Sequence, residues 1–265
     1  MRNLGRPLIA TLLVAGLLPA CGSPDPAEGG DPPAAQDELT GTLTVFAAAS
    51  LTDVFQQLGD DLTGDHPDLA VRFNFAGSSA LATQIVQGAP ADVFASANQA
   101  QMTVVSDAGL ADGDPTVFTE NVLEIAVPAG NPGGVTGLAD FADPELTLAV
   151  CAAEVPCGVA ATQVFAAAGV TPVPDTEEED VRAALTKVQL GEVDAALVYA
   201  SDVRSAGSEV EGIGFPEAEG AVNEYPVAVL SEAPNPDAAR AFVKLVLSDE
   251  GQAALEAAGF RPSSA

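Results

Sequence analysis

Two serines occupy positions where a polypeptide can bind a small anion. Ser50 follows the β-prone run 44–46 and three alanines, and apolar residues at helical spacing begin directly after it. Ser78 repeats this arrangement of strand end, small residues, serine and helix. A helix N-terminus offers free N–H groups and partial positive charge, to which a serine adds a hydroxyl donor. The pattern predicts either an ordinary capped helix, with Ser50 as N-cap and Asp53 as its capping-box partner, or an anion site at Ser50 and Ser78, with Ser79 as the second choice.

Any anion at these serines would be held without a countercharge. The chain has 9 Lys and Arg against 38 Asp and Glu, a net charge of −29. Residues 1–21 are a candidate export signal, and its removal would take away Arg2 and Arg6, which leaves 7 basic against 38 acidic residues, a net charge of −31. None of the remaining basic residues adjoins Ser50 or Ser78. So acidic a surface argues against a nucleic-acid partner. Dipoles and hydrogen bonds would have to hold the ion.

The sequence does not supply a recognisable set of catalytic groups. His66 is the single histidine and lies in a polar turn, so a Ser-His-Asp arrangement is not indicated. No P-loop or dinucleotide-binding glycine pattern is present. The acidic run 177–180 is a candidate metal site, but we favour a solvated helix start there. We expect no enzymatic activity, no cofactor and no bound metal, and keep a secreted enzyme or a structural lipoprotein as less favoured alternatives.

The three cysteines divide into one candidate lipidation site and one candidate pair. Residues 1–21 resemble a lipoprotein signal peptide, with a short apolar run and a lipobox-like sequence ending at Cys21. The alternative is a plain secretory signal cut near Ala20. Outside the cytoplasm Cys151 and Cys157 would form a disulfide, although a Cys-x5-Cys metal site remains open.

Residues 22–40 are rich in Pro, Gly and acid and predict a disordered linker that tethers the folded part to the membrane. From there the chain alternates strand and helix signals, which predicts parallel sheets wrapped by helices, with ligands at the carboxyl ends of strands. Strands are expected at 71–75, 93–95, 122–127, 146–150, 195–199 and 225–230, and helices after Ser50, after 77–79, after Asn98, and at 158–168, 181–189 and 236–258.

Several motifs, in this order, resemble the molybdate-binding proteins of ABC transporters. They are TVFAAASLTDVF from Thr44, FNFAGSSALATQIVQGAPADVFASANQAQM from Phe73, EVPCG from Glu154, EEDVRAAL from Glu178, ALVYASD from Ala196 and EYPVAV from Glu224. The resemblance implies a receptor for molybdate or tungstate. It also implies a ligand set of three side chains, Ser50, Ser78 and Tyr199, and the backbone N–H groups of Cys157 and Val181. Cys157 stands where the family usually has alanine, which a backbone donor tolerates.

The resemblance further implies an α/β fold of the periplasmic-binding-protein type (type II-like), with parallel-rich sheets flanked by helices and the ligand in the cleft between two lobes. The expected lobes are 41–121 plus 224–265, and 122–223. Tyr225 is expected to be a hinge or packing residue. The expected partner is an ABC permease of the cytoplasmic membrane, and the protein a monomer anchored outside that membrane through Cys21. A receptor of the same fold for another tetrahedral oxyanion, such as sulfate, is the alternative.

Overall fold

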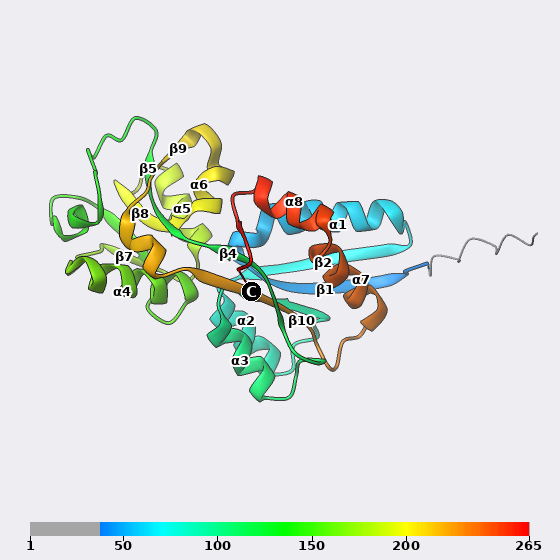
Figure 1. Cartoon of the computed structure of the whole chain (residues 1–265). Coiled ribbons are helices and arrows are strands. Elements are labelled where there is room, and N and C mark those ends of the chain that lie inside the picture. Colours follow the sequence, from blue (N-terminus) through cyan, green and yellow to red (C-terminus); the bar gives the residue numbers. More distant parts are fainter. Residues whose placement is uncertain (1–37, 265) are drawn as a thin grey trace, which may run out of the picture. The chain divides into compact units, whose positions relative to one another are not determined.

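The computed structural model describes residues 38–264 of the 265-residue chain. The predicted signal peptide 1–21, lipidation at Cys21 and the linker 22–40 as far as residue 37 lie outside the described residues. The described residues belong to one compact unit, which contains two β-sheets flanked by helices (Figure 1).

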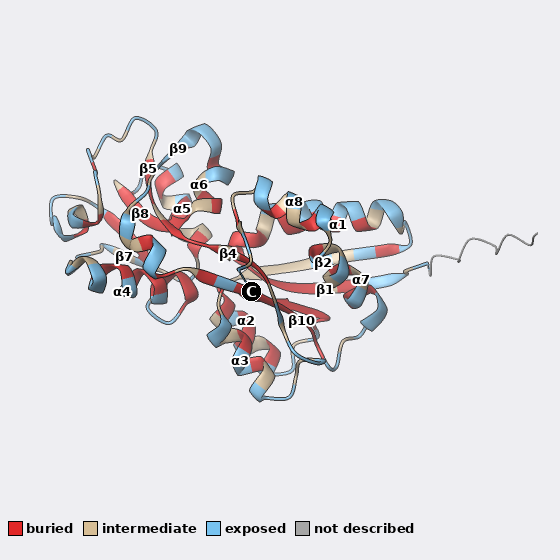
Figure 2. Ribbon diagram, viewed as in Figure 1, coloured by how far each residue is buried: buried red, intermediate tan, exposed pale blue. Residues whose placement is uncertain are grey.

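The first sheet has six strands and is buried on both faces. In order across the sheet the strands are β11 (Arg261–Pro262), β4 (Thr116–Asn121), β10 (Asn223–Val229), β3 (Val93–Ala95), β1 (Gly41–Ala48) and β2 (Leu69–Ala76). Helices α1 (Thr52–Asp65), α7 (Pro236–Val246) and α8 (Asp249–Ala257) pack on one face, and α2 (Ser78–Val86) and α3 (Gln99–Asp107) on the other. Because both faces are covered, strand β1 is apolar and buried from Val45 to Ala48, and Val45 belongs to one core and Phe46 to the other (Figure 2).

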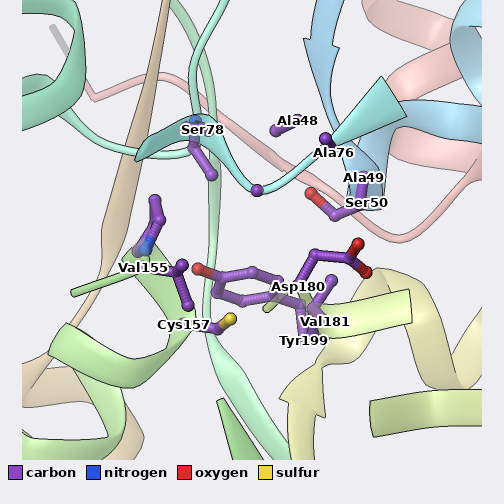
Figure 3. Close-up of a pocket in the computed structure, with 13 residues that line it drawn as sticks. Ala48, Ala49, Ser50, Ala76, Ser78, Val155, Cys157, Asp180, Val181 and Tyr199 are labelled. Atoms are coloured by element: carbon purple, nitrogen blue, oxygen red, sulfur yellow. Dashed lines mark hydrogen bonds between the residues drawn. The ribbon is translucent and has the colours of Figure 1, made fainter. Parts of the chain in front are cut away.

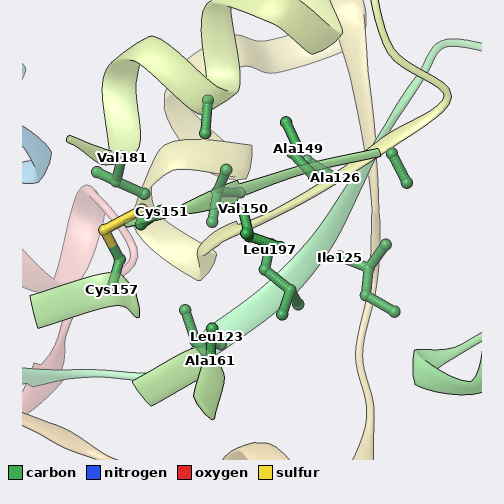
Figure 4. Close-up of a cluster of buried hydrophobic side chains, with 14 of the residues drawn as sticks. Leu123, Ile125, Ala126, Ala149, Val150, Cys151, Cys157, Ala161, Val181 and Leu197 are labelled. Atoms are coloured by element: carbon green, nitrogen blue, oxygen red, sulfur yellow. A yellow bond between two sulfur atoms is a disulfide. The ribbon is translucent and has the colours of Figure 1, made fainter. Parts of the chain in front are cut away.

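The second sheet has five strands and a single large core. Its strands, in order, are β7 (Thr176–Glu178), β6 (Leu148–Cys151), β8 (Ala195–Tyr199), β5 (Leu123–Pro128) and β9 (Val210–Ile213). Helices α4 (Pro156–Ala168), α5 (Val181–Gln189) and α6 (Ala200–Ala206) pack around it, together with short 3-10 turns at Leu138–Ala142, Gly207–Glu209 and Pro216–Gly220. Figure 4 shows side chains of this core, among them Leu123, Ile125 and Leu197, together with the Cys151–Cys157 disulfide.

The α/β class and the two flanked sheets agree with the prediction, but the sheets are mixed rather than parallel. In the first sheet only β1–β2 and β1–β3 are parallel, and in the second only β6–β7 and β6–β8. The antiparallel pairs arise because the chain runs directly from β4 into β5, and later returns along β10, instead of closing each unit with a crossover helix.

The passages between the sheets lie close to the predicted lobe bounds. Strand β4 ends at Asn121 in the first sheet, and β5 begins at Leu123 in the second. Strand β10 begins at Asn223 in the first sheet. We call the parts around the six-stranded and the five-stranded sheet the first and second lobe. Their exact residue bounds stay a prediction.

Most predicted elements are present, with shifts at their ends. The Asn98 cap of α3 and the span of α5 are confirmed. The prediction missed strands β4, β7, β9 and β11 and helix α6. The acidic run 177–180 is not a helix start: its first residues belong to β7, and only Asp180 caps a helix, by accepting the N–H groups of Arg182 and Ala183. Residues 176–178 form a strand instead of a helix because they pair with β6.

Candidate functional site

A pocket between the two lobes contains all five residues of the predicted ligand set. Its cavity has a volume of about 20 Å³ and is lined by residues from both sheets and their helices (Figure 3). The lining residues are Ala48, Ala49, Ser50, Ala76, Gly77, Ser78, Ala97, Val155, Pro156, Cys157, Asp180, Val181 and Tyr199. Ser79, the second choice, lies instead on a separate depression with Glu154 and residues 177–179. Its place on α2 turns it away from the ligand set.

Ser50 lies in a tight turn at the carboxyl end of β1. It is the middle residue of a 3-10 turn, Ala49–Leu51, that leads into α1, so it is not the N-cap that the sequence predicted. The predicted capping partner Asp53 instead forms an ion pair with Arg182. The turn buries Ser50, and its Oγ lies 2.9 Å from the hydroxyl oxygen of Tyr225. Tyr225 therefore fixes the position of this hydroxyl, a contact that links residues 175 positions apart.

Ser78 is the first residue of α2, with Gly77 as its N-cap. Its buried Oγ accepts a hydrogen bond of 3.0 Å from the Ala97 N–H. Because this bond uses an oxygen lone pair, the hydroxyl proton of Ser78 is available to a ligand. The backbone N–H groups of the first helical turn also lack intrahelical partners. Ser78 thus presents a donor, held at a fixed position by strand β3 and the residues that follow it.

Tyr199 ends strand β8 and is 1% exposed. Among the described residues its hydroxyl is buried without a hydrogen-bond partner. The hydroxyl of Tyr225 lies near enough to influence its titration but does not meet hydrogen-bond geometry with the Tyr199 oxygen. Burial raises the pKa of Tyr199 well above its usual value, and the neighbouring Tyr225 and Asp202 raise it further. The phenol therefore stays protonated and can donate a hydrogen bond. A buried donor left unpaired is costly, which favours a ligand partner.

Cys157 and Val181 contribute helix N-termini from the second lobe. Cys157 is the second residue of α4, after Pro156, and Val181 is the first residue of α5. At such positions the backbone N–H has no intrahelical partner. The Asp180 carboxylate occupies the next two N–H groups of α5, those of Arg182 and Ala183. Both helices thus direct free N–H groups and positive dipole ends to the pocket.

A disulfide joins Cys151, at the end of β6, to Cys157 in the first turn of α4. It closes a loop with a sequence separation of 6, which contributes roughly 2 kcal/mol to stability on the chain-entropy model. The predicted pairing of the two cysteines is confirmed. Because their sulfurs are bonded to each other, the structure does not present them as the two thiolate ligands that the Cys-x5-Cys metal site requires.

No Lys or Arg is among the residues that line the described pocket, and Asp180 is its single acidic residue. The charges lie just outside. Arg182 contacts Asp53 at 2.6 Å and Asp202 at 3.0 Å, and Asp202 also accepts the N–H of Tyr199. Burial raises the pKa of Asp202 to about 7, while Arg182 and the Tyr199 N–H act in the opposite direction.

The sequence analysis singled out the five residues of the ligand set, but it gave no role to Asp202, Arg182 or Gly77. Asp202 lies three residues after Tyr199, which is a helix-start spacing and a usable signal. Arg182 pairs with a residue 129 positions away, and no local pattern reports such a contact. Gly77 allows a close approach, because a Cβ there would meet the backbone oxygen of Glu179 from the second lobe.

Three residues that line the pocket carry hydroxyl groups, and two contribute backbone N–H groups at helix N-termini. Such a set of donors suits a small, fully ionised oxyanion, because that ion presents only hydrogen-bond acceptors. No helix in the part of the chain that the structure describes is long and apolar enough to cross a membrane.

Comparison with known proteins places this fold and pocket in a family. The model of bacterial extracellular solute-binding proteins matches residues 43–261. The molybdate-binding protein ModA of Mycobacterium tuberculosis is 45% identical over 253 residues, which cover 96% of this chain and 95% of that protein. A Bacillus subtilis protein, YvgL, provisionally named an ABC transporter substrate-binding lipoprotein, is 29% identical and covers 96% of this chain and 95% of its own.

A solved structure, the periplasmic molybdate-binding protein of Azotobacter vinelandii, has a TM-score of 0.72 at 21% identity and covers 84% of this chain and 100% of its own. This likeness supports the two-lobed fold. The matched family model and the 45% identity over nearly the whole chain are the stronger findings. The chain belongs to the family of bacterial extracellular solute-binding proteins.

Proposed function

We propose that this protein captures molybdate, or tungstate, outside the cytoplasm and delivers it to an ABC importer. The observation that carries the proposal is the pocket itself, where three buried hydroxyls and two helix N-termini meet without a basic residue. The relatives named above as molybdate-binding proteins support molybdate as the ligand. The activity is binding and delivery, not catalysis.

In this proposal Ser50, Ser78 and Tyr199 donate their hydroxyl protons to oxygens of the ion. The N–H groups of Cys157 and Val181 donate to the remaining oxygens. Hydrogen bonds to a charged partner contribute about 1.5–3 kcal/mol each, so a few of them hold a dianion tightly despite the charge of the whole protein. The lobes come together around the ion because the donors lie on both of them.

Titration of the purified domain with molybdate, tungstate, sulfate and phosphate tests the function. We expect strong calorimetric binding of molybdate and tungstate. Sulfate is a smaller dianion and should bind more weakly. Phosphate carries a proton at neutral pH, which finds no acceptor within the ligand set of five donors, so phosphate should also bind more weakly. Tight binding of sulfate with none of molybdate would assign the pocket to the alternative oxyanion, and no response to any of the four would refute the proposal.

We also propose that the mature chain is anchored outside the cytoplasmic membrane through lipid on Cys21, as a monomer that docks on its permease. The signal-like residues 1–21 support this, as does the lipoprotein name of the Bacillus relative. Mass spectrometry of the mature N-terminus should find an acyl-modified cysteine at position 21. An unmodified terminus elsewhere would contradict the anchor.

A further inference from the structure

Arg182 links the two lobes beside the pocket, although it does not line it. It is the second residue of α5 in the second lobe, and its Nη2 lies 2.6 Å from Oδ2 of Asp53 in the first turn of α1 in the first lobe. Its Nε forms an ion pair of 3.0 Å with Oδ1 of Asp202 on α6, although those two atoms are not aligned as a hydrogen bond. One guanidinium is thus shared between carboxylates of both lobes.

Each member of this group is linked to a residue of the ligand set, either by its position in the chain or by a hydrogen bond. Asp53 lies three residues after Ser50, and Arg182 directly follows Val181. The other Asp202 oxygen, Oδ2, accepts the backbone N–H of Tyr199 at 3.1 Å. An ion pair between Asp53 and Arg182 therefore fixes the first-lobe serine relative to the second-lobe donors.

The burial of the three groups shows which contact is specific to lobe closure. The Asp202 side chain is 0% exposed and Arg182 25%, so this pair is an internal feature of the second lobe that neutralises a buried carboxylate. The Asp53 side chain is 55% exposed, so it can be solvated when the lobes separate. The Asp53–Arg182 contact is therefore the part of this group that joins the two lobes.

We propose that Asp53, Arg182 and Asp202 form a clasp that holds the lobes closed, with Arg182 as a positioning residue that acts through Val181 and Tyr199. The inference rests on the proposed function, because it concerns the affinity of the same pocket. The clasp slows the release of the ion and adds affinity without any basic group touching it.

Asp53→Asn gives the decisive test because two models predict opposite signs. If the charges near the pocket act only through their field, removal of a negative charge strengthens the binding of a dianion. If the clasp operates, the same change removes the cross-lobe ion pair and weakens binding. We expect the dissociation constant for molybdate to rise about 3- to 10-fold, mainly through faster release.

The matched control is Asp112→Asn. Asp112 is 51% exposed and pairs with Arg240 at 3.4 Å, with both residues in the first lobe, so it reproduces the charge change without crossing between the lobes. It should bind molybdate like wild type, and the two variants should melt within about 2 °C of each other because exposed ion pairs contribute little to stability.

The proposal of a clasp is wrong if the Asp53→Asn variant binds molybdate as tightly as wild type or more tightly. A second check is the combination with Arg182→Gln: the two changes should be less than additive in molybdate affinity, because either one opens the same contact, and full additivity would contradict the clasp. Failure of the proposed function looks different, since wild type itself would then not respond to molybdate.

Discussion

The interior of the pocket and its rim both have to be compatible with a dianion in a strongly acidic protein, but they differ in the groups they use. The interior has no basic side chain and a single acidic one, Asp180, and it offers the hydroxyls of Ser50, Ser78 and Tyr199 and the free N–H groups of two helices. The rim, a few residues away along the chain, carries the charged group of Asp53, Arg182 and Asp202. Fixed dipoles can bind a dianion without a basic side chain. A basic side chain would attract other anions as well. Charged pairs serve better where two surfaces must hold together and still separate.

The comparison also shows where burial of charge is costly. Tyr199 is buried as a neutral group, and its raised pKa only keeps it protonated. Asp202 is buried as an acid whose ionised form depends on Arg182, and its pKa is raised to about 7. The rim should therefore respond to pH in the physiological range, and the interior should not.

The largest effect is expected for the rim residue Asp202, as a change with pH in the free energy of unfolding of the protein. The pKa of Asp202 in the folded protein, about 7, lies above the value of about 3.9 for an unfolded chain. The native state then binds more protons between these values, so the contribution of Asp202 to the free energy of unfolding is complete below about pH 4 and is lost as the pH rises through 7, on the order of 4 kcal/mol in all.

Chemical unfolding of wild type and Asp202→Asn between pH 4 and 8 measures this contribution as a difference, because the other carboxylates are common to both. The free energy of unfolding of wild type should fall relative to the variant as the pH rises. A constant difference would show that Asp202 titrates normally. The other ionisable groups that act on or face Asp202 are Arg182, Asp53, Asp180, Tyr199 and Tyr225.

The next effect concerns the interior. Ser78→Ala and Tyr199→Phe should each weaken molybdate binding about 10- to 100-fold, since each removes a hydrogen bond of about 1.5–3 kcal/mol to a charged ligand. Ser79→Ala is the matched control, because Ser79 adjoins Ser78 but does not line the pocket. Calorimetry should find the control unchanged. Wild-type affinity in Ser78→Ala, together with a loss in Ser79→Ala, would exchange the roles of the two serines.

A smaller effect should come from the approach of the lobes. Gly77→Ala would place a Cβ against the backbone oxygen of Glu179, which cannot move as a side chain could. Overpacking of this kind costs about 1–3 kcal/mol, so we expect molybdate affinity to fall about tenfold with little change in the melting temperature. Gly64→Ala, at a position with open space around it, is the control. Equal affinity in the two variants would show that the lobes do not need this contact.

The smallest effect is expected for Tyr225→Phe, which removes the partner of the Ser50 hydroxyl. A hydrogen bond between neutral groups contributes about 0.5–1.5 kcal/mol, or roughly 2- to 10-fold in affinity. The change should have no further effect on molybdate binding in a Ser50→Ala background. An equal loss in both backgrounds would mean that Tyr225 acts through packing with its aromatic neighbours and not through Ser50.

Local patterns were sufficient for much of this molecule. The order of most strands and helices, the Asn98 cap and the span of α5 follow from apolar spacing and capping residues, which act within a few residues. Ser50 and Ser78 followed from the local pattern of a serine between small residues and a helix, because that pattern depends on neighbouring residues alone. The roles of Tyr199, Cys157 and Val181 were implied by the family resemblance, and all five residues line one pocket.

Other features depended on contacts between distant residues. Hydrophobic patterns do not specify strand direction, so the antiparallel pairs of β5 and β10 could not be predicted from them. Nor could the ion pair of Asp53 with Arg182, 129 residues apart, or the contact of Ser50 with Tyr225, 175 apart. Asp53 satisfied the local pattern of a helix cap, yet its carboxylate pairs with an arginine from the other lobe, because the folded chain brings a full positive charge within 2.6 Å of it.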